Sequence, residues 1–242
     1  MKKHILCLVL GLVLAMSLHV IAQGRVFTFS ADQANYVAVG PDYETSENQI
    51  AKVQLSLKVQ VLGPVDFSYT QKGLWAVGEP SAPFREWNYN PGASATLSHK
   101  MASVRCGYEH ESNGMDNQAG PNSRSWERFY CTPSWEYQWC GLKIRSSNKF
   151  WSMWTHVGEA YYLRDNPDME RYQGRQEAQI RVSLLERLTW TGTFRKMSRQ
   201  HEVAWSFGDF AVYGQYVHGF GQMLRMYNRQ TESAYMGIAL SW

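Results

Sequence analysis

The stretch AKVQLSLKVQVLG, residues 51–63, decides the fold because apolar and polar residues alternate along it. Successive side chains of a β-strand point to opposite sides, so residues two apart share a face. One face of this stretch carries Val53, Leu55, Leu57, Val59 and Val61, and the other carries Gln54, Ser56, Lys58 and Gln60. The pattern predicts a strand with one apolar and one polar face.

The alternation recurs in three later stretches: EAQIRVSLLE (177–186), HEVAWSF (201–207) and YMGIALSW (235–242). The last of these ends on an aromatic residue. No segment after residue 22 offers the roughly 18 consecutive apolar residues that a membrane-spanning helix requires. If the mature chain lies in a membrane, it must cross that membrane as strands.

The first 22 residues, MKKHILCLVLGLVLAMSLHVIA, combine a basic start, an apolar stretch and small or slim residues at the end. This layout predicts a secretory signal peptide cut after Ala22, with a retained membrane anchor as the alternative. We expect residues 23–48 to form an irregular N-terminal segment and residues 49–242 to form one domain. The 24 basic residues, less Lys2 and Lys3, nearly balance the 21 acidic ones, which gives no reason to expect a nucleic-acid partner.

Two all-β architectures fit this pattern. A secreted sandwich buries its apolar face in a core, whereas an outer-membrane barrel turns that face to lipid and keeps polar groups inside. The export signal favours the barrel, as does the aromatic content of 14%, because aromatic girdles mark both membrane interfaces. The terminal aromatic on an apolar strand face points the same way. We therefore predict an antiparallel transmembrane β-barrel.

One strand of this barrel carries a candidate nucleophile and base. In ASVRCGYEHES (102–112), His110 and Ser112 share the less polar face, so they would point out towards lipid. Polar groups are costly there and are usually functional. If the next strand pairs as a hairpin, Glu127 can face His110 and complete a Ser–His–acid triad. On spacing alone, a polar hairpin tip with an incidental His-x-Ser remains open.

Six motifs, in one order along the chain, resemble the outer membrane phospholipase A family: YTQKGLW (69–75), APFREWNYNP (82–91), YEHESNG (108–114), SRSWERFY (123–130), DNPDMERYQG (165–174) and YGQYVHGFGQMLRMYNRQT (213–231). The resemblance implies a twelve-stranded barrel whose active site lies on its lipid-facing exterior. It also implies a glycerophospholipid substrate, a Ca²⁺ cofactor and a homodimer as the active form, in the outer membrane of a Gram-negative bacterium.

The resemblance assigns roles to individual residues. Ser112 would be the nucleophile, His110 the general base and the amide of Gly114 an oxyanion donor. Calcium would be held by oxygen ligands from Ser123, Met115, Ser81 of a partner subunit and, in the unpaired subunit, Asp165.

The chain departs from the family pattern in three places. Glu127 stands where the family has an asparagine behind the histidine, and Met115 stands where an arginine is common. The stretch between Gly114 and Ser123 is also longer than in the family. Asp116, Asn117 or Asn122 could therefore take over part of the calcium coordination.

Gln71 is a polar residue in an apolar stripe, on the face that also carries Val65, Phe67, Tyr69 and Trp75. It lies either near the interface, where water reaches it, or in a dimer seam, where its amide bonds across subunits. The dimer implied by the resemblance favours the seam.

The strand register makes a further prediction about the cysteines. In an antiparallel pair each step along one strand is a step back along the other. If His110 faces Glu127, then Cys106 faces Cys131, with proximity expected more firmly than a bond. Cys140 would be the leftover thiol, on the next strand.

Two functions follow from these observations. The first is a calcium-dependent serine esterase that releases acyl chains from the sn-1 and sn-2 positions of glycerophospholipids. The alternative is a catalytically impaired barrel that acts as a pore or a structural outer-membrane protein, which Glu127 and the longer loop would favour.

Overall fold

The computed structural model describes residues 27–41, 49–115, 123–153, 166 and 168–240. Its elements in chain order are β1 (Thr28–Ser30), β2 (Tyr36–Pro41), β3 (Gln49–Leu62), β4 (Val65–Trp75), β5 (Phe84–His99), β6 (Ala102–Ser112), β7 (Ser125–Trp139), β8 (Leu142–Met153), α3 (Met169–Gln173), β9 (Gln176–Leu184), β10 (Leu188–Arg195), β11 (Ser198–Phe207), β12 (Phe210–Phe220) and β13 (Gln230–Leu240). Within the described residues, no helix is both long and apolar enough to span a membrane.

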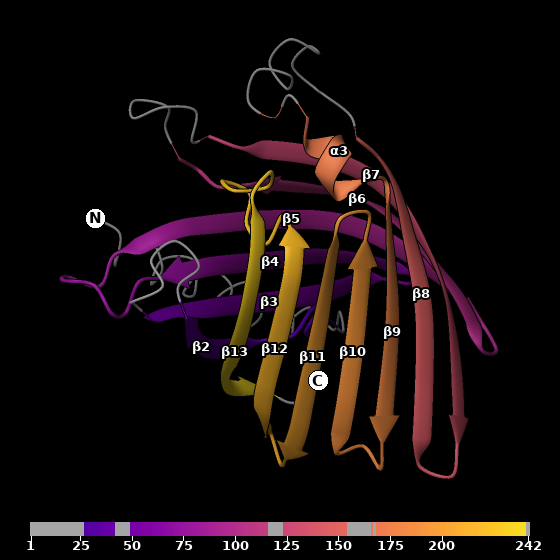
Figure 1. The fold of residues 1–242 in the computed structure, drawn as a ribbon. Coiled ribbons are helices and arrows are strands. Elements are labelled where there is room, and N and C mark those ends of the chain that lie inside the picture. The colour runs from indigo at the N-terminus through magenta and orange to yellow at the C-terminus, as the bar shows by residue number, and fades with distance from the viewer. Residues whose placement is uncertain (1–26, 42–48, 116–122, 154–165, 167, 241–242) are drawn as a thin grey trace.

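The strands β2–β13 form a closed antiparallel barrel of the predicted twelve strands. Each strand pairs with its neighbours in the chain, and β13 closes the ring by pairing with β2. The short β1 pairs with β3 through Thr28 and Gln60, beyond the part of β3 that pairs with β2. In Figure 1 the strands β8–β13 stand upright in front, and β3–β5 run across behind them.

The barrel begins earlier than the sequence predicts. Residues 23–48 were expected to be irregular, but they contain β1 and β2, and β2 is a ring strand. The prediction was wrong because β2 is only six residues long, too short for alternation to stand out. Its pairing with the distant β13, from Tyr36↔Ala239 to Val39↔Met236, defines it as a strand. The predicted signal peptide, residues 1–22, lies outside the described residues.

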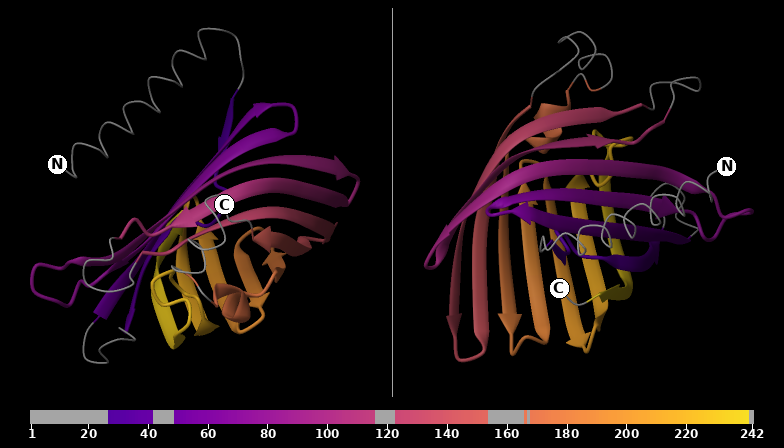
Figure 2. Two further views of the ribbon diagram at one scale, coloured as in Figure 1. Left: turned by 90° about the horizontal axis from the view of Figure 1, so that it is seen from above. Right: turned by 180° about the vertical axis from the view of Figure 1, so that it is seen from behind.

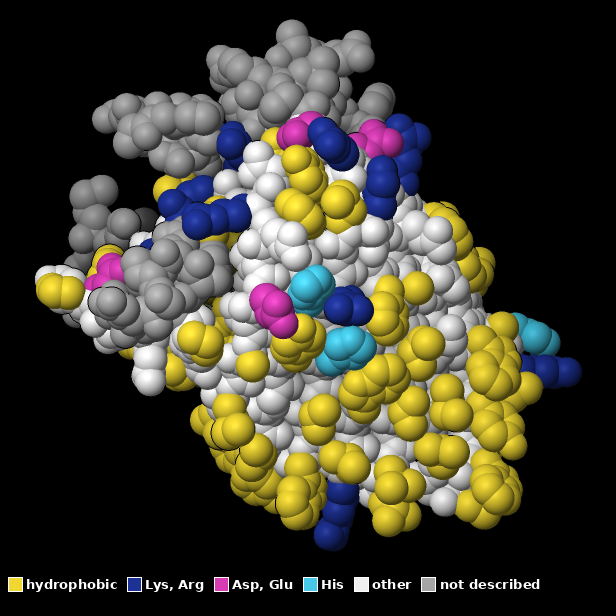
Figure 3. Space-filling view, viewed as in Figure 1, with side chains coloured by type: hydrophobic (Ala, Val, Ile, Leu, Met, Phe, Trp, Pro, Cys, Tyr) yellow, Lys and Arg dark blue, Asp and Glu magenta, His cyan; other side chains and the backbone are white. Residues whose placement is uncertain are grey.

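Apolar side chains cover the outside of the barrel and polar ones fill the inside. Leu55 is 52% exposed, whereas its neighbours Gln54 and Ser56 are buried. Met236 and Ile238 of the last strand are 72% and 58% exposed. Figure 3 shows the hydrophobic side chains spread over the lower outer wall in front. A soluble sandwich would show the reverse, so the barrel prediction is confirmed.

The two ends of the barrel differ in their connections. At one end, strands join through tight turns, and Gly63 and Gly208 have φ values of 53° and 64° there, which suit glycine. At the other end lie longer connections, of which 76–83 and 221–229 are described in full. The right view of Figure 2, from behind, shows the turns of the upright strands at the bottom and α3 near the top. Short turns at one end and longer loops at the other are typical of outer-membrane barrels.

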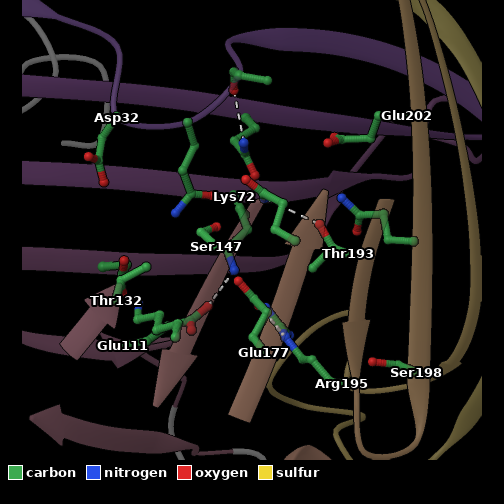
Figure 4. Close-up of a pocket in the computed structure, with 18 of the residues that line it drawn as sticks. Asp32, Lys72, Glu111, Thr132, Ser147, Glu177, Thr193, Arg195, Ser198 and Glu202 are labelled. Atoms are coloured by element: carbon green, nitrogen blue, oxygen red, sulfur yellow. Dashed lines mark hydrogen bonds and ion pairs between the residues drawn. The ribbon is translucent and has the colours of Figure 1, made fainter. Parts of the chain in front are cut away.

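Ion pairs between residues of different strands line the lumen. Lys72 pairs with Glu111 at 2.7 Å, and Arg195 pairs with Glu177 at 2.6 Å. These four residues are labelled in Figure 4, which looks into a cavity of about 310 Å³ between them. The pairing offsets part of the cost of taking these charges out of water, and the charged side chains make the lumen a polar core.

Candidate active site

His110 and Glu127 face each other across β6 and β7, as predicted. Their side chains are partly exposed on the outer face, with His110 Nδ1 3.6 Å from Glu127 Oε1. Ser112 lies two residues along β6 on the same face as His110 and is also partly exposed. The structure therefore brings the three predicted catalytic residues together on the outside of the barrel.

Residues that alternate with the catalytic ones point inward and hold the two strands from behind. Glu111, between His110 and Ser112, is only 4% exposed. Its carboxylate accepts a hydrogen bond from Trp126 Nε1 at 3.0 Å, and it lies 3.5 Å from Arg128 Nη2. Because Trp126 and Arg128 flank Glu127, the lumen contacts join β6 and β7 directly behind the triad.

Tyr108 adds a second contact to Glu127. Its hydroxyl interacts with the Glu127 carboxylate, and its ring packs on Phe129 with centroids 5.1 Å apart. This contact was not predicted from the sequence. The signal was available, because Tyr108 shares the face of His110 and lies diagonally opposite Glu127.

Asn113 shapes the loop that follows the nucleophile. Its side-chain Oδ1 accepts hydrogen bonds from the backbone amides of Arg124 at 3.0 Å and Met115 at 3.4 Å. The backbone amide of Asn113 donates to the Arg124 carbonyl. The next residue, Gly114, has a φ of 57°, a value that glycine adopts without strain. Asn113 therefore closes the base of the loop beside Ser112, a role that was not predicted from the sequence.

Gln71, Tyr89 and Ser112 lie in one row across three adjacent strands. Gln71 pairs with Tyr89 between β4 and β5, and Tyr89 pairs with Ser112 between β5 and β6. Gln71 is partly exposed, and its Oε1 accepts a hydrogen bond from Tyr69 at 3.4 Å. The outward-facing Gln71 is thus two strands from the nucleophile, with the Tyr89 ring between them.

The predicted calcium ligands are only partly gathered. Met115 and Ser123 are adjacent at the base of the loop, because Asn113 bonds the amides of Met115 and Arg124. Ser81 lies exposed in the connection between β4 and β5, at the same end of the barrel. Asp165 lies outside the described residues. Nowhere in the described part of the chain do three His, Cys, Asp or Glu side chains form a group that could hold a metal.

The cysteine prediction is confirmed for one pair and wrong in one detail. Cys106 and Cys131 face each other in the β6–β7 ladder and form a disulfide. Cys140 is free, as predicted, and it is exposed, but it lies in the turn between β7 and β8 and not on the next strand.

Comparison with known proteins places this geometry in a family. Residues 22–240 match the family model described as phospholipase A1. Phospholipase A1 of Escherichia coli K12 is 27% identical over 251 residues, an alignment that covers 89% of this chain and 78% of the relative.

Two solved structures share the fold. The Salmonella typhi outer membrane phospholipase dimer with bound calcium superposes with a TM-score of 0.72 at 24% identity, covering 88% of this chain and 92% of that one. The Escherichia coli outer membrane phospholipase A gives a TM-score of 0.71 at the same identity, covering 88% and 91%. The chain therefore belongs to the phospholipase A1 family of enzymes and forms a β-barrel of the Gram-negative outer membrane.

Proposed function

We propose that this protein is a calcium-dependent phospholipase that hydrolyses the sn-1 and sn-2 acyl esters of glycerophospholipids and is active as a homodimer. The observation that carries the proposal is the cross-strand contact of His110 with Glu127 beside Ser112, on the outer face of the barrel. A triad in that place has no access to a water-filled lumen, but it has direct access to membrane lipid.

The outer surface next to the triad suits a lipid substrate. Leu97, Val104 and Phe129 lie on β5, β6 and β7 below the site and are 72%, 43% and 45% exposed. Acyl chains can lie against these side chains, because both surfaces are apolar. The ester groups of such a lipid then reach the level of Ser112, near the loop end of β6.

In the proposed reaction the Ser112 hydroxyl attacks the ester carbonyl and gives its proton to His110. A tetrahedral oxyanion forms and collapses to an acyl-enzyme, while His110 protonates the leaving lysophospholipid oxygen. Water then attacks the acyl-enzyme, gives a proton to His110 and releases the fatty acid as Ser112 regains its proton.

Glu127 orients the base in this scheme. Its carboxylate lies beside His110 Nδ1, which leaves Nε2 for Ser112, and it stabilises the imidazolium that forms during each half-reaction. The Tyr108 hydroxyl also interacts with this carboxylate. The Gly114 amide, two residues after Ser112, would bind the oxyanion, and charge stabilisation of this kind is commonly the largest catalytic contribution.

Met115 and Ser123, at the base of the loop, have oxygen atoms that could bind a calcium ion. Met115 and Ser123 offer neutral carbonyl and hydroxyl oxygens, which Ca²⁺ accepts, and Ser81 of a partner subunit would complete the set. When bound, the ion would add positive charge near the developing oxyanion. The row Gln71–Tyr89–Ser112 supports a seam beside the active site, because a partner that contacts Gln71 would also lie close to the nucleophile.

The test is fatty-acid release from mixed micelles of detergent and phospholipid by the Ser112→Ala variant. We expect release to be abolished while the barrel still migrates as a heat-modifiable band. Ser125→Ala is the matched control, because Ser125 faces Ser112 in the ladder. It should keep its activity and still react with a fluorophosphonate, whereas Ser112→Ala should not. Turnover in Ser112→Ala would remove this serine from the mechanism, and an inactive wild-type barrel would favour the pore or structural alternative.

A further inference from the structure

The hydrogen-bond ladder between β5 and β6 is interrupted behind the catalytic base. Pairing runs from His99↔Ala102 to Gly92↔Glu109, and Tyr89↔Ser112 is paired beyond the gap. The two positions between them, Asn90 opposite Glu111 and Pro91 opposite His110, are not paired.

The gap coincides with a missing donor. In an antiparallel sheet both backbone groups of a residue point to one neighbouring strand, and those of the next residue point to the other. Thr96 donates to Pro64 on the β4 side, so the odd-numbered residues of β5 point to β6. The strand β5 pairs with β4 without a break over this region, so Pro91 directs its nitrogen to β6. Proline has no amide hydrogen, and no bond can form.

The carbonyl oxygen of His110 is the acceptor of the missing bond. The carbonyl of Met101 and the amide of Asn113 both bond to β7, so the odd-numbered residues of β6 point to β7 and the even-numbered ones point to β5. The His110 carbonyl therefore faces Pro91. It accepts a hydrogen bond from the side-chain Nδ2 of Asn90 at 2.9 Å instead.

We propose that Asn90 is a positioning residue of the active site, whose amide replaces the donor that Pro91 lacks and fixes the backbone of His110. The inference rests on the proposed role of His110 as the base. Asn90 is 8% exposed and points into the lumen, so it does not touch substrate on the outer face. Its effect on catalysis passes through the backbone from which the imidazole projects.

The bond from Asn90 to the His110 carbonyl gives a role to Asn90 and Pro91, two neighbouring residues of the motif NYNP (88–91) that the triad does not use. A strand with an ordinary residue at position 91 would hold His110 through the backbone and would need no amide at position 90. With proline there, a side chain must supply the bond, because an unsatisfied carbonyl away from water is destabilising. The two residues therefore depend on each other.

The experiment is a double-mutant cycle of Asn90→Ala and Pro91→Ala, assayed for kcat and KM on micellar phospholipid. Asn90→Ala alone should lower kcat by roughly tenfold with KM unchanged, because a misplaced base slows the reaction without weakening binding. Pro91→Ala alone restores a backbone donor and should stay near the wild-type rate. The double variant should recover to within about twofold of Pro91→Ala, since the new backbone amide at position 91 supplies the bond.

Controls separate this inference from the proposed function. Gln179→Ala removes another lumen amide, bonded to Thr193 on the β9–β10 side, and should leave kcat unchanged. If Asn90→Ala does not fold, Asn90→Asp, which keeps the side-chain volume, replaces it in the double-mutant cycle with Pro91→Ala. A full rate in Asn90→Ala, or a loss that Pro91→Ala does not restore, overturns the inference. Activity in His110→Ala would instead overturn the proposed function.

Discussion

Cys106 and Cys131 are direct cross-strand partners, joined by a disulfide with their Cα atoms 4.1 Å apart. They belong to the same unbroken β6–β7 ladder as His110 and Glu127, and the two pairs are four ladder positions apart. The disulfide therefore reports the register that places the acid behind the base. Any slip of β6 against β7 would separate both pairs at once.

The cysteines can be counted chemically. Of the three from Cys106 onward, one should react with iodoacetamide before reduction and all three after it, because Cys140 alone is free and exposed. Mass spectrometry of peptides locates the labels. Labelling of Cys106 without reductant would contradict the bond. The Cys106→Ser/Cys131→Ser variant should still form a barrel and lose about 2–4 kcal/mol of stability, because the ladder remains.

Replacing Glu127 should lower the catalytic activity less than replacing the base His110. We expect Glu127→Ala to retain roughly a hundredfold more activity than His110→Ala, because an orienting group is less costly to lose than the proton acceptor. Tyr108→Phe removes only the hydroxyl that interacts with Glu127 and should have the smallest effect of the three. Values of kcat on micellar phospholipid give the order. Equal losses in the Glu127 and His110 variants would mean that Glu127 also shapes the site.

Gln71→Leu should weaken the dimer without unfolding the barrel. A hydrogen bond between proteins in the membrane is worth about 0.6–2 kcal/mol, so the dimer constant should change by about threefold to thirtyfold. Sedimentation in detergent, with calcium present, measures it. Asn148→Leu is the control, because Asn148 is a partly exposed residue of β8, outside the Gln71–Ser112 row. An unchanged constant in Gln71→Leu would place this amide at the membrane interface instead.

A shared calcium site can be tested by mixing two inactive subunits. Ser81→Ala keeps its nucleophile but would lack a ligand for its partner, and Ser112→Ala keeps Ser81 but lacks the nucleophile. In a mixed dimer, the Ser112→Ala subunit supplies Ser81 to the intact triad, so activity should exceed that of either variant alone. A chelator should abolish this activity, and Ca²⁺ should restore it better than Mg²⁺, which demands stricter octahedral geometry. No gain on mixing would show that the sites are not shared.

Glu111 should matter for stability as well as for the site. It pairs with Lys72 at 2.7 Å and bonds Trp126 in the lumen, so Glu111→Ala leaves the partly buried Lys72 ammonium without its partner. Breaking a buried pair from one side costs about 3–5 kcal/mol. The temperature at which the heat-modifiable band is lost should fall clearly. It should recover in part in Lys72→Met/Glu111→Ala, where the stranded charge is also removed.

The sequence alone determined which residues face lipid and which face the lumen. The two-residue period is a property of the strand backbone, so the alternation at Leu55, Ile238 and Val203 assigned the outer face without knowledge of any neighbour. It also determined the β6–β7 register, once His110 was set opposite Glu127. The match of Cys106 with Cys131 followed from that single pairing.

The alignment of the other strands depends on contacts between distant parts of the chain. A slip of two residues keeps every side chain on its face, so alternation cannot choose among such registers. The row that joins Gln71, Tyr89 and Ser112 depends on two such choices. The closure of the ring through β2 joins residues some 200 positions apart in the chain, and no local pattern encodes a contact of that range. The bond from Asn90 to His110 likewise exists because a proline in one strand meets one particular carbonyl in the next.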